Sequence, residues 1–256
     1  MDSGILTVTD LRVRLGGLTV LDGINLSVPQ GTVVGLIGPN GAGKTTVFNA
    51  ICGLVPVVSG QIAFNGESLR GVRPHRLAGL GISRTLQGVG LFASMTVREN
   101  VMSAHVEAPA GGIVADAVAM PWMDASDHRA GQRADDLLTE LGIGDVAHKR
   151  PSELPYPVQK RVALARALMS DPRLIMLDEP AGGIGADDMS ELGELIRSWV
   201  PHRSVLLVEH HMELVMSVCD LIWVLDAGAV IASGSPAEVR SNPAVLAAYL
   251  GDEGAA

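Results

Sequence analysis

The sequence predicts an α/β fold with a mainly parallel core sheet, and three observations support this prediction. Short β-branched runs and helical patterns alternate after residue 174, as they do where crossover helices join parallel strands. A glycine-rich loop at residues 38–43 stands between an expected strand and an expected helix, which is the start of a βα unit. Strand signals fade between residues 88 and 166, where we expect a helical insert.

Turn-prone residues separate the N-terminal strands at Gly16-Gly17, Asp22-Gly23 and residues 29–31. The expected strands cover residues 5–8, 25–28, 32–37, 62–64, 82–85, 174–177, 204–208, 221–225 and 230–232. The expected helices cover residues 44–53, 96–105, 127–141, 187–199, 212–218 and 243–250. Residues 108–122 are rich in Ala, Gly and Pro, so we expect this segment to be the most flexible.

Composition limits the possible functions. The 256 residues suffice for one large domain, and 47% hydrophobic residues with only 3% aromatics predict an aliphatic core. The net charge of -9 and the presence of only three lysines argue against nucleic acid as a partner. We expect no signal peptide and, without a run of about 18 apolar residues, no membrane span. Cys52 and Cys219 are expected to be buried free thiols of a reducing cytoplasm, with one long-range disulfide as the open alternative.

A phosphate-binding loop is the strongest motif. Residues 38–45 read GPNGAGKT and match G-x-x-x-x-G-K-[ST] in full. Glycines let backbone N–H groups turn toward an anion, and the following helix directs its N-terminus to the same place. Lys44 can reach the β- and γ-phosphates, and the Thr45 hydroxyl can bind Mg²⁺. The residues expected to bind ATP are Gly38, Pro39, Asn40, Gly41, Ala42, Gly43, Lys44, Thr45 and Thr46. The plainer alternative is a glycine-rich turn with a helix cap.

An acidic pair ends the apolar run that begins at Leu174 and reads LIMLDEP. In an open α/β sheet the C-terminal strand ends form the ligand crevice. Asp178 can support Mg²⁺ there, and Glu179 can orient or deprotonate an attacking water. A solvated acidic turn is the alternative for the pair alone, and the phosphate loop upstream makes it the weaker one.

Three further segments resemble motifs of ABC transporter ATPases. Residues 82–87 (ISRTLQ) resemble the Q-loop, residues 154–168 the signature motif with its helix, and residues 208–210 (VEH) the switch-histidine segment. The resemblance implies a P-loop NTPase (ABC ATPase) fold with an antiparallel β subdomain, in one domain spanning residues 1–256 with residues 88–166 as its helical subdomain. It also implies that Gln87 contacts the Mg²⁺ and water and senses the membrane partner. His210 would lie near the γ-phosphate.

Within this family the chain most resembles ATPase subunits of branched-chain amino-acid importers. The narrower match is carried by residues 81–87, 91–100, 209–216, 234–236 and 242–251. The resemblance implies ATP hydrolysis that energises an importer at the cytoplasmic face of the membrane. The implied partners are permease subunits contacted through residues 88–105, a second ABC ATPase that is identical or different, and, indirectly, a substrate-binding protein. Urea or amide importers share much of this pattern and remain an alternative.

The sequence departs from the family at three places. The signature, usually LSGGQ or LAYGQ, reads LPYPV here, so Pro157 replaces a glycine whose N–H would bind the partner's γ-phosphate. Leu15 stands where the family stacks an aromatic residue on adenine, and Gly185 stands where it carries Asp or Asn in the D-loop. Proline is tolerated in a first helical turn, so we expect the fold to survive and the phosphate to lose a donor.

These departures lead to competing hypotheses. An asymmetric dimer would hydrolyse the ATP held by this chain if a partner supplies a normal signature. A catalytically weak nucleotide-binding or regulatory subunit is the alternative that the signature prolines favour. A soluble ABC protein acting on DNA or ribosomes is disfavoured, because such proteins usually carry two ATP domains or long coiled coils.

Overall fold

A computed structural model describes residues 4–85, 88–105 and 122–253. The chain divides into two compact units, which we call unit 1 (Met1–Leu77 and Arg173–Ala256) and unit 2 (Ala78–Pro172). The insert predicted at residues 88–166 lies within unit 2, and the assignment of the whole chain to a single domain remains a prediction. The segment expected to be flexible, residues 108–122, falls almost wholly outside the described residues. Among the described residues, no helix combines the length and the apolar character needed to cross a membrane.

Unit 1 contains an antiparallel sheet with the strand order β2-β1-β4-β5. Its strands are β1 (Leu6–Leu15), β2 (Leu18–Val28), β4 (Val57–Phe64) and β5 (Glu67–Ser68). The predicted turn at Gly16-Gly17 is the two-residue hairpin loop between β1 and β2, and both glycines have positive φ. The turn expected at Asp22-Gly23 was wrong. These residues form an irregularity inside a continuous β2, where the pairing register shifts and Gly23 has φ 74°.

The parallel strands of unit 1 form its core. Their order is β10-β9-β3-β8-β7, with β3, β7, β8 and β9 parallel to one another and β10 antiparallel to β9. Every residue of β3, β7 and β8 is buried, as expected for parallel strands covered on both faces. The bounds are β3 (Val33–Ile37), β7 (Leu174–Asp178), β8 (Ser204–Val208), β9 (Leu221–Asp226) and β10 (Ala229–Gly234).

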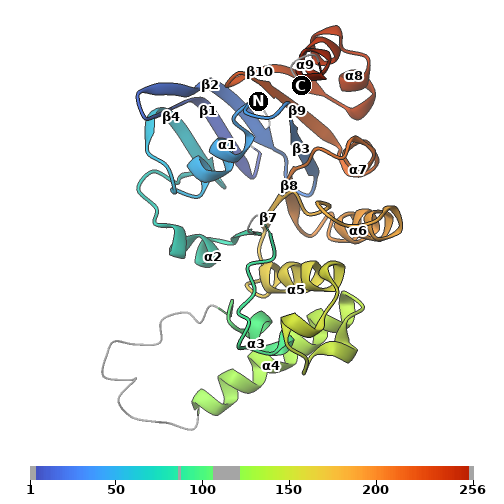
Figure 1. The fold of residues 1–256 in the computed structure, drawn as a ribbon. Helices are drawn as coiled ribbons and strands as arrows, with labels where there is room; N and C mark the ends of the chain where they lie inside the picture. The colour runs from blue at the N-terminus through green and yellow to red at the C-terminus, as the bar shows by residue number, and fades with distance from the viewer. Residues whose placement is uncertain (1–3, 86–87, 106–121, 254–256) are drawn as a thin grey trace. The chain divides into compact units, whose positions relative to one another are not determined.

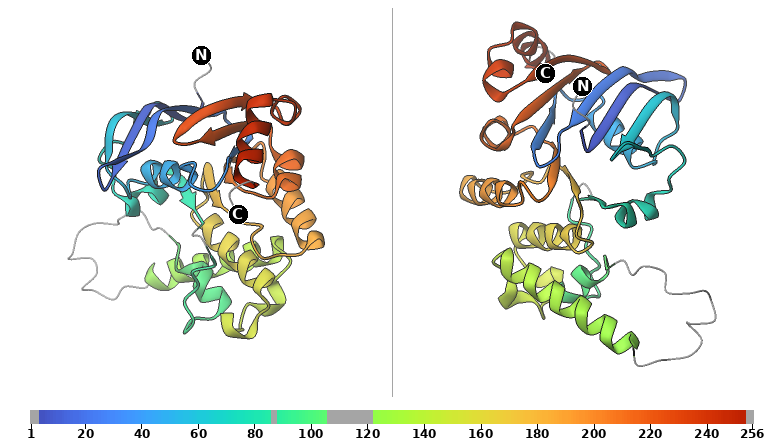
Figure 2. Two further views of the ribbon diagram at one scale, coloured as in Figure 1. Left: turned by 45° about the horizontal axis from the view of Figure 1, so that its top comes forward. Right: turned by 180° about the vertical axis from the view of Figure 1, so that it is seen from behind.

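Helices cover both faces of these parallel strands. Helix α1 lies on the side of the antiparallel sheet, and α6 and α7 lie on the opposite side (Figure 1). The close packing of α7 requires Gly35 in β3, because a Cβ atom there would lie 2.9 Å from the Cys219 sulfur. Cys52 and Cys219 are buried and free, as predicted. The helices are α1 (Lys44–Ile51), α6 (Ala186–Ser198), α7 (Met212–Val218), α8 (Pro236–Arg240) and α9 (Pro243–Glu253), and the last two pack beside β9 and β10 (Figure 2).

Unit 2 is mainly helical. Its principal helices are α3 (Val97–Met102), α4 (Trp122–Glu140) and α5 (Tyr156–Leu168), and all three pack against one another. Thr96 caps α3 by accepting the Glu99 N–H, while the Glu99 carboxylate accepts the Thr96 N–H in return. The shorter elements are β6 (Ile82–Arg84) and the 3-10 turns Gly144–Val146 and Pro151–Glu153, while α2 (Leu77–Leu80) and the turn Pro74–Arg76 join the two units in sequence.

Candidate active site

The carboxyl ends of three neighbouring parallel strands place the predicted site. Val208 of β8 pairs with Leu36 of β3 on one side and with Asp178 of β7 on the other. The chain therefore leaves all three strands at the same edge of the sheet. Its continuations are the phosphate loop after β3, the acidic pair at the end of β7 and the histidine segment after β8. An edge of this kind is where open α/β sheets bind ligands.

The phosphate loop has the backbone conformation that its glycines predict. Gly38, Gly41 and Gly43 have φ of 148°, 80° and 103°, values that residues with side chains rarely adopt. Gly38 also passes so close to β9 that a Cβ atom would lie 2.0 Å from the Leu225 carbonyl oxygen. Gly43 is the N-cap of α1, and this helix has no side-chain cap hydrogen bond. The N–H groups of its first turn point to the place where an anion would bind.

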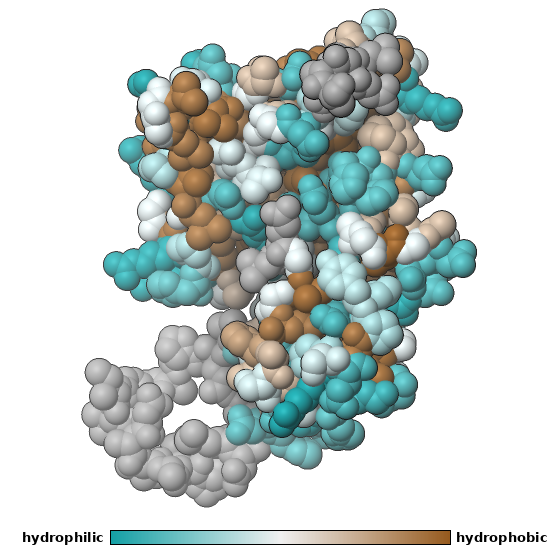
Figure 3. All heavy atoms as spheres, viewed as in Figure 1, coloured by the Kyte–Doolittle hydropathy of each residue, from teal (hydrophilic) through white to brown (hydrophobic). Residues whose placement is uncertain are grey.

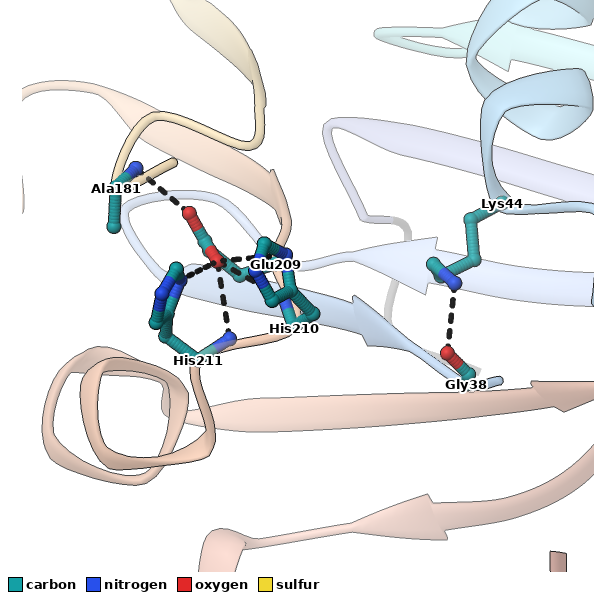
Figure 4. Close-up of polar contacts among 6 residues, drawn as sticks. All are labelled: Gly38, Lys44, Ala181, Glu209, His210 and His211. Atoms are coloured by element: carbon teal, nitrogen blue, oxygen red, sulfur yellow. Dashed lines mark hydrogen bonds and ion pairs between the residues drawn. The ribbon is translucent and has the colours of Figure 1, made fainter. Parts of the chain in front are cut away.

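Lys44 is the cation of this loop. Its side chain is buried, and the ammonium donates hydrogen bonds to the carbonyl oxygens of Gly38 at 2.7 Å and Pro39 at 2.9 Å. These carbonyls hold the positive charge inside the loop, close to the N-terminus of α1 (Figure 4). Asn40, Gly41 and Thr45 are exposed along the same loop, so its outer side is accessible.

The two neighbouring residues of the acidic pair differ in how far they are buried. Asp178 ends β7 and is 4% exposed, whereas Glu179 is partly exposed. Glu179 has φ 49°, an uncommon conformation for a residue with a side chain, and its N–H donates to the Val208 carbonyl oxygen at 2.9 Å. The turn therefore directs the second carboxylate away from the strand while the first stays buried at the strand end.

The segment after β8 contains two residues that the sequence reasoning did not assign to the site. Besides the predicted His210, Glu209 and His211 take part in a hydrogen-bonded cluster with the backbone of Ala181 (Figure 4). Glu209 is fully buried although its side chain is polar. The signal in the sequence was a carboxylate directly after the apolar residues 205–208 and directly before the expected switch histidine.

Two other predicted regions belong to the part of the sequence assigned to unit 2. Gln87 is outside the described residues, so its predicted contact with Mg²⁺ stays a prediction. In unit 2 the signature helix α5 begins as expected, with Pro155 as its N-cap and Pro157 in its first turn. The Gln159 N–H donates to the Pro155 carbonyl oxygen at 3.1 Å, so the helix forms normally in spite of both prolines.

The two remaining residues that depart from the family pattern, Leu15 and Gly185, are both exposed in unit 1. Leu15 is 38% exposed beside the hairpin turn, in an apolar surface patch over the antiparallel sheet that also includes Leu18, Val57 and Val58 (Figure 3). Gly185 is the N-cap of α6 and leaves that helix without a side-chain cap. An Asp or Asn would have supplied an oxygen for the first-turn N–H groups.

Comparisons with known proteins agree with this geometry. The ABC transporter family model matches residues 21–182, and a model described as branched-chain amino acid ATP-binding cassette transporter matches residues 229–255. The chain is 40% identical to the high-affinity branched-chain amino acid transport ATP-binding protein BraF of Pseudomonas aeruginosa, covering 98% of this chain and 100% of BraF. It is 38% identical to the corresponding protein LivG of Escherichia coli strain K12, with the same coverage of both chains.

A solved structure supports the fold. The ADP conformation of MJ1267, an ATP-binding cassette of an ABC transporter, superimposes with a TM-score of 0.82 at 27% identity. The superposition covers 96% of this chain and 98% of MJ1267. The phosphate loop, the acidic strand end and these matches lead to one assignment. The chain belongs to the ABC transporter family and is one of its ATP-binding, ATP-hydrolysing cassettes.

Proposed function

We propose that this chain binds and hydrolyses Mg²⁺-ATP to energise an importer of branched-chain amino acids. One observation carries the proposal: the phosphate loop, the Asp178-Glu179 pair and His210 all leave the sheet at the same edge. A cation, a set of backbone N–H groups and two carboxyl groups therefore follow strands that end at one edge of the sheet, which suits a polyphosphate with its metal.

The residues at this edge fit a magnesium ion. Mg²⁺ prefers hard oxygen donors, and the exposed Thr45 hydroxyl and the Asp178 carboxylate are of that kind. Gln87 is the third expected ligand. The bound ion would neutralise charge on the β- and γ-phosphates.

Each site residue receives a role from its position. Lys44 binds the β- and γ-phosphates with its ammonium, since its burial and its carbonyl partners keep the charge in the loop. Glu179 orients or deprotonates the attacking water, because its strained turn directs the carboxylate outward from a buried strand end. His210 contacts the γ-phosphate with an imidazole that is 55% exposed.

The transported substrate is inferred from the relatives. BraF and LivG are both described as branched-chain amino acid transport proteins, and the C-terminal residues 229–255 match a model specific to such transporters. Urea or amide importers remain the alternative that the sequence pattern allows. Measuring uptake of labelled leucine and labelled urea by the reconstituted complex separates these substrates.

The partners follow from the same relatives. We infer permease subunits, a second ABC ATPase and, indirectly, a substrate-binding protein, with this chain at the cytoplasmic face of the membrane. Residues 88–105 form the expected permease contact, and there Phe92 is 51% exposed. The fully buried Asn100 holds this loop, because its amide accepts from the Phe92 N–H and donates to the carbonyl oxygens of Phe92, Met95 and Thr96. Purifying the intact membrane complex and identifying its chains tests these partners.

A second candidate function rests on the two prolines of the signature. In a dimer where one subunit's signature binds the other's γ-phosphate, Pro157 offers no N–H. The ATP held by this chain would turn over against a normal partner signature, and the ATP facing α5 would turn over poorly. The chain would then work in an asymmetric dimer, or as a regulatory subunit with weak turnover.

The deciding experiment is ATP hydrolysis by the purified complex with Glu179→Gln in this chain. If this chain's own site turns over, the substitution removes most of the activity, by about a hundredfold or more, because the water loses its base. Exchange of the exposed Glu213 for Gln is the matched control and leaves the rate unchanged. A complex whose rate is the same with and without Glu179 would favour the regulatory subunit.

A further inference from the structure

Glu209 is a buried carboxylate whose oxygens all have N–H partners. Its exposed fraction is 0%, and burying such a charge is costly unless hydrogen bonds compensate. One oxygen, Oε1, accepts the Ala181 N–H at 2.7 Å. The other, Oε2, accepts the N–H groups of His210 at 2.9 Å and His211 at 3.1 Å, and lies 3.0 Å from the Nδ1 atom of His211.

These contacts join two segments of the site that are 28 residues apart in sequence. Ala181 lies two residues after Glu179, at the start of the D-loop. The same two segments are joined once more by the hydrogen bond from the Glu179 N–H to the Val208 carbonyl oxygen. Glu209 is therefore the side-chain link between the turn that carries Glu179 and the turn that carries His210 (Figure 4).

Both the backbone and the ring of His210 lie beside Glu209. The imidazole is 55% exposed, its Nδ1 atom lies 3.7 Å from Glu209 Oε2, and its ring centre lies 4.1 Å from that of His211. The N–H groups on both sides of its Cα, its own and that of His211, are held by the same Glu209 oxygen. Removing the whole Glu209 carboxyl group would release the backbone of His210, held by Oε2, together with that of Ala181, held by Oε1.

Glu209, His210 and His211 also have the atom types of a transition-metal site, and their ligand atoms lie within 4.8 Å of one another. The hydrogen bonds argue for a different role. Oε2 already accepts the N–H groups of His210 and His211 and lies 3.0 Å from the His211 Nδ1 atom, and a metal ion would have to displace these contacts. The backbone N–H groups of the cluster form hydrogen bonds with the Glu209 carboxyl oxygens. These hydrogen bonds fix the backbone at Ala181, His210 and His211.

We propose that Glu209 is a positioning residue for ATP hydrolysis, which keeps His210 and the segment after Glu179 at a constant separation. The inference rests on the proposed roles of His210 and Glu179. Glu209 does not touch ATP in this account. It acts through the two backbones that it holds, so its loss should lower the rate of hydrolysis more than the affinity for ATP.

The test is Glu209→Gln in the assembled complex. The amide can accept at only one of its two ends, so it cannot serve Ala181 and the two histidines together. We expect kcat to fall about ten- to hundredfold, the range for losing a charge-assisted hydrogen bond. KM for ATP should stay within about twofold, because the phosphate loop is unchanged. Glu213→Gln, the same change at an exposed position of α7, should leave both constants unaltered.

A double-mutant cycle separates positioning from general destabilisation. If Glu209 works through His210, adding Glu209→Gln to His210→Ala lowers the single-turnover rate far less than it does in the wild-type background. Losses that simply add, or a KM that rises in step with the fall in kcat, would overturn the inference. If Glu209→Gln does not fold, as judged by its melting curve, Glu209→Asp keeps the charge and takes its place in the cycle.

Different results would contradict the proposed function and the role of Glu209. A wild-type complex that does not hydrolyse ATP, and is unaffected by Glu179→Gln, would remove the proposed function. A wild-type complex that hydrolyses ATP, needs Glu179, and keeps its kcat in Glu209→Gln would remove only the role of Glu209.

Discussion

Helices α1 and α5 begin with opposite chemistry, although the family resemblance assigns both N-termini to phosphate. Helix α1 begins after Gly43 in a loop whose glycines leave the backbone N–H groups uncovered. Helix α5 begins after Pro155 and carries Pro157 in its first turn, so two of the N–H groups in this region do not exist. The comparison separates what a helix needs from what a ligand needs.

A helix does not need its first N–H groups, since they have no partner inside the helix. Proline is therefore well tolerated there, and α5 forms normally. A phosphate does need those groups, because they are the donors that bind it. The chain has thus kept the glycine loop and lysine expected to bind its own phosphates, while the helix start expected to serve a partner's nucleotide carries two prolines.

Lys44→Ala removes the cation beside the N-terminus of α1, which is the helix start with uncovered N–H groups. Of the three substitutions, we expect this one to have the largest effect. The phosphate loop would lose its buried cation and its hydrogen bonds to the phosphates. We expect ATP affinity to fall by about a hundredfold or more, as measured by equilibrium binding of a labelled ATP analogue. Lys160→Ala is the control, because this lysine lies in the second turn of α5, with its ammonium 5.5 Å from the centre of the Tyr156 ring. Equal losses in both variants would contradict the distinction between the helices.

Pro157→Gly should make the N-terminus of α5, which lacks N–H donors at its two prolines, resemble the family's signature. A restored N–H could bind the partner's γ-phosphate, so the ATPase rate of the complex should rise about ten- to hundredfold. Pro236→Gly makes the same change in the first turn of α8 and should leave the rate unchanged. A complex that already turns over normally and shows no gain would dismiss the asymmetric dimer.

Leu15→Tyr should have the smallest effect of the three substitutions, since it adds an adenine contact beside a phosphate loop that already has its lysine and glycines. An aromatic ring at this exposed position can stack on adenine, a contact worth about 1–3 kcal/mol in other nucleotide complexes. We expect the dissociation constant for ATP to fall by about fivefold or more. Leu18 lies across the same hairpin and is 74% exposed, so Leu18→Tyr is the matched control. A similar gain from both variants would point to a nonspecific effect of the added ring.

Much of the fold was predictable, because its signals are local. The parallel strands were recognised by short apolar runs, and all of β3, β7 and β8 proved to be buried. The strands of the antiparallel sheet were predicted too short. Asp22-Gly23 has the composition of a turn, and only its pairing with β1 shows that the chain continues as one strand with an irregularity.

Asn100 shows a similar limit in unit 2. In the sequence it is a polar residue of an expected helix, without any sign of burial. In the structure its exposed fraction is 0%, and its amide binds the backbone of residues 92–96. A side chain that satisfies a neighbouring loop cannot be recognised until the path of that loop is known.

The sequence by itself determined the chemistry of the phosphate loop and of the acidic strand end. Both depend on residues within a few positions of one another, where glycine conformation and the start of a helix are local properties. Only the tertiary structure decided that Glu209 and Ala181 meet. Their contact requires β7 and β8 to be neighbours in a particular register, and pairing between distant strands is not encoded in any short segment.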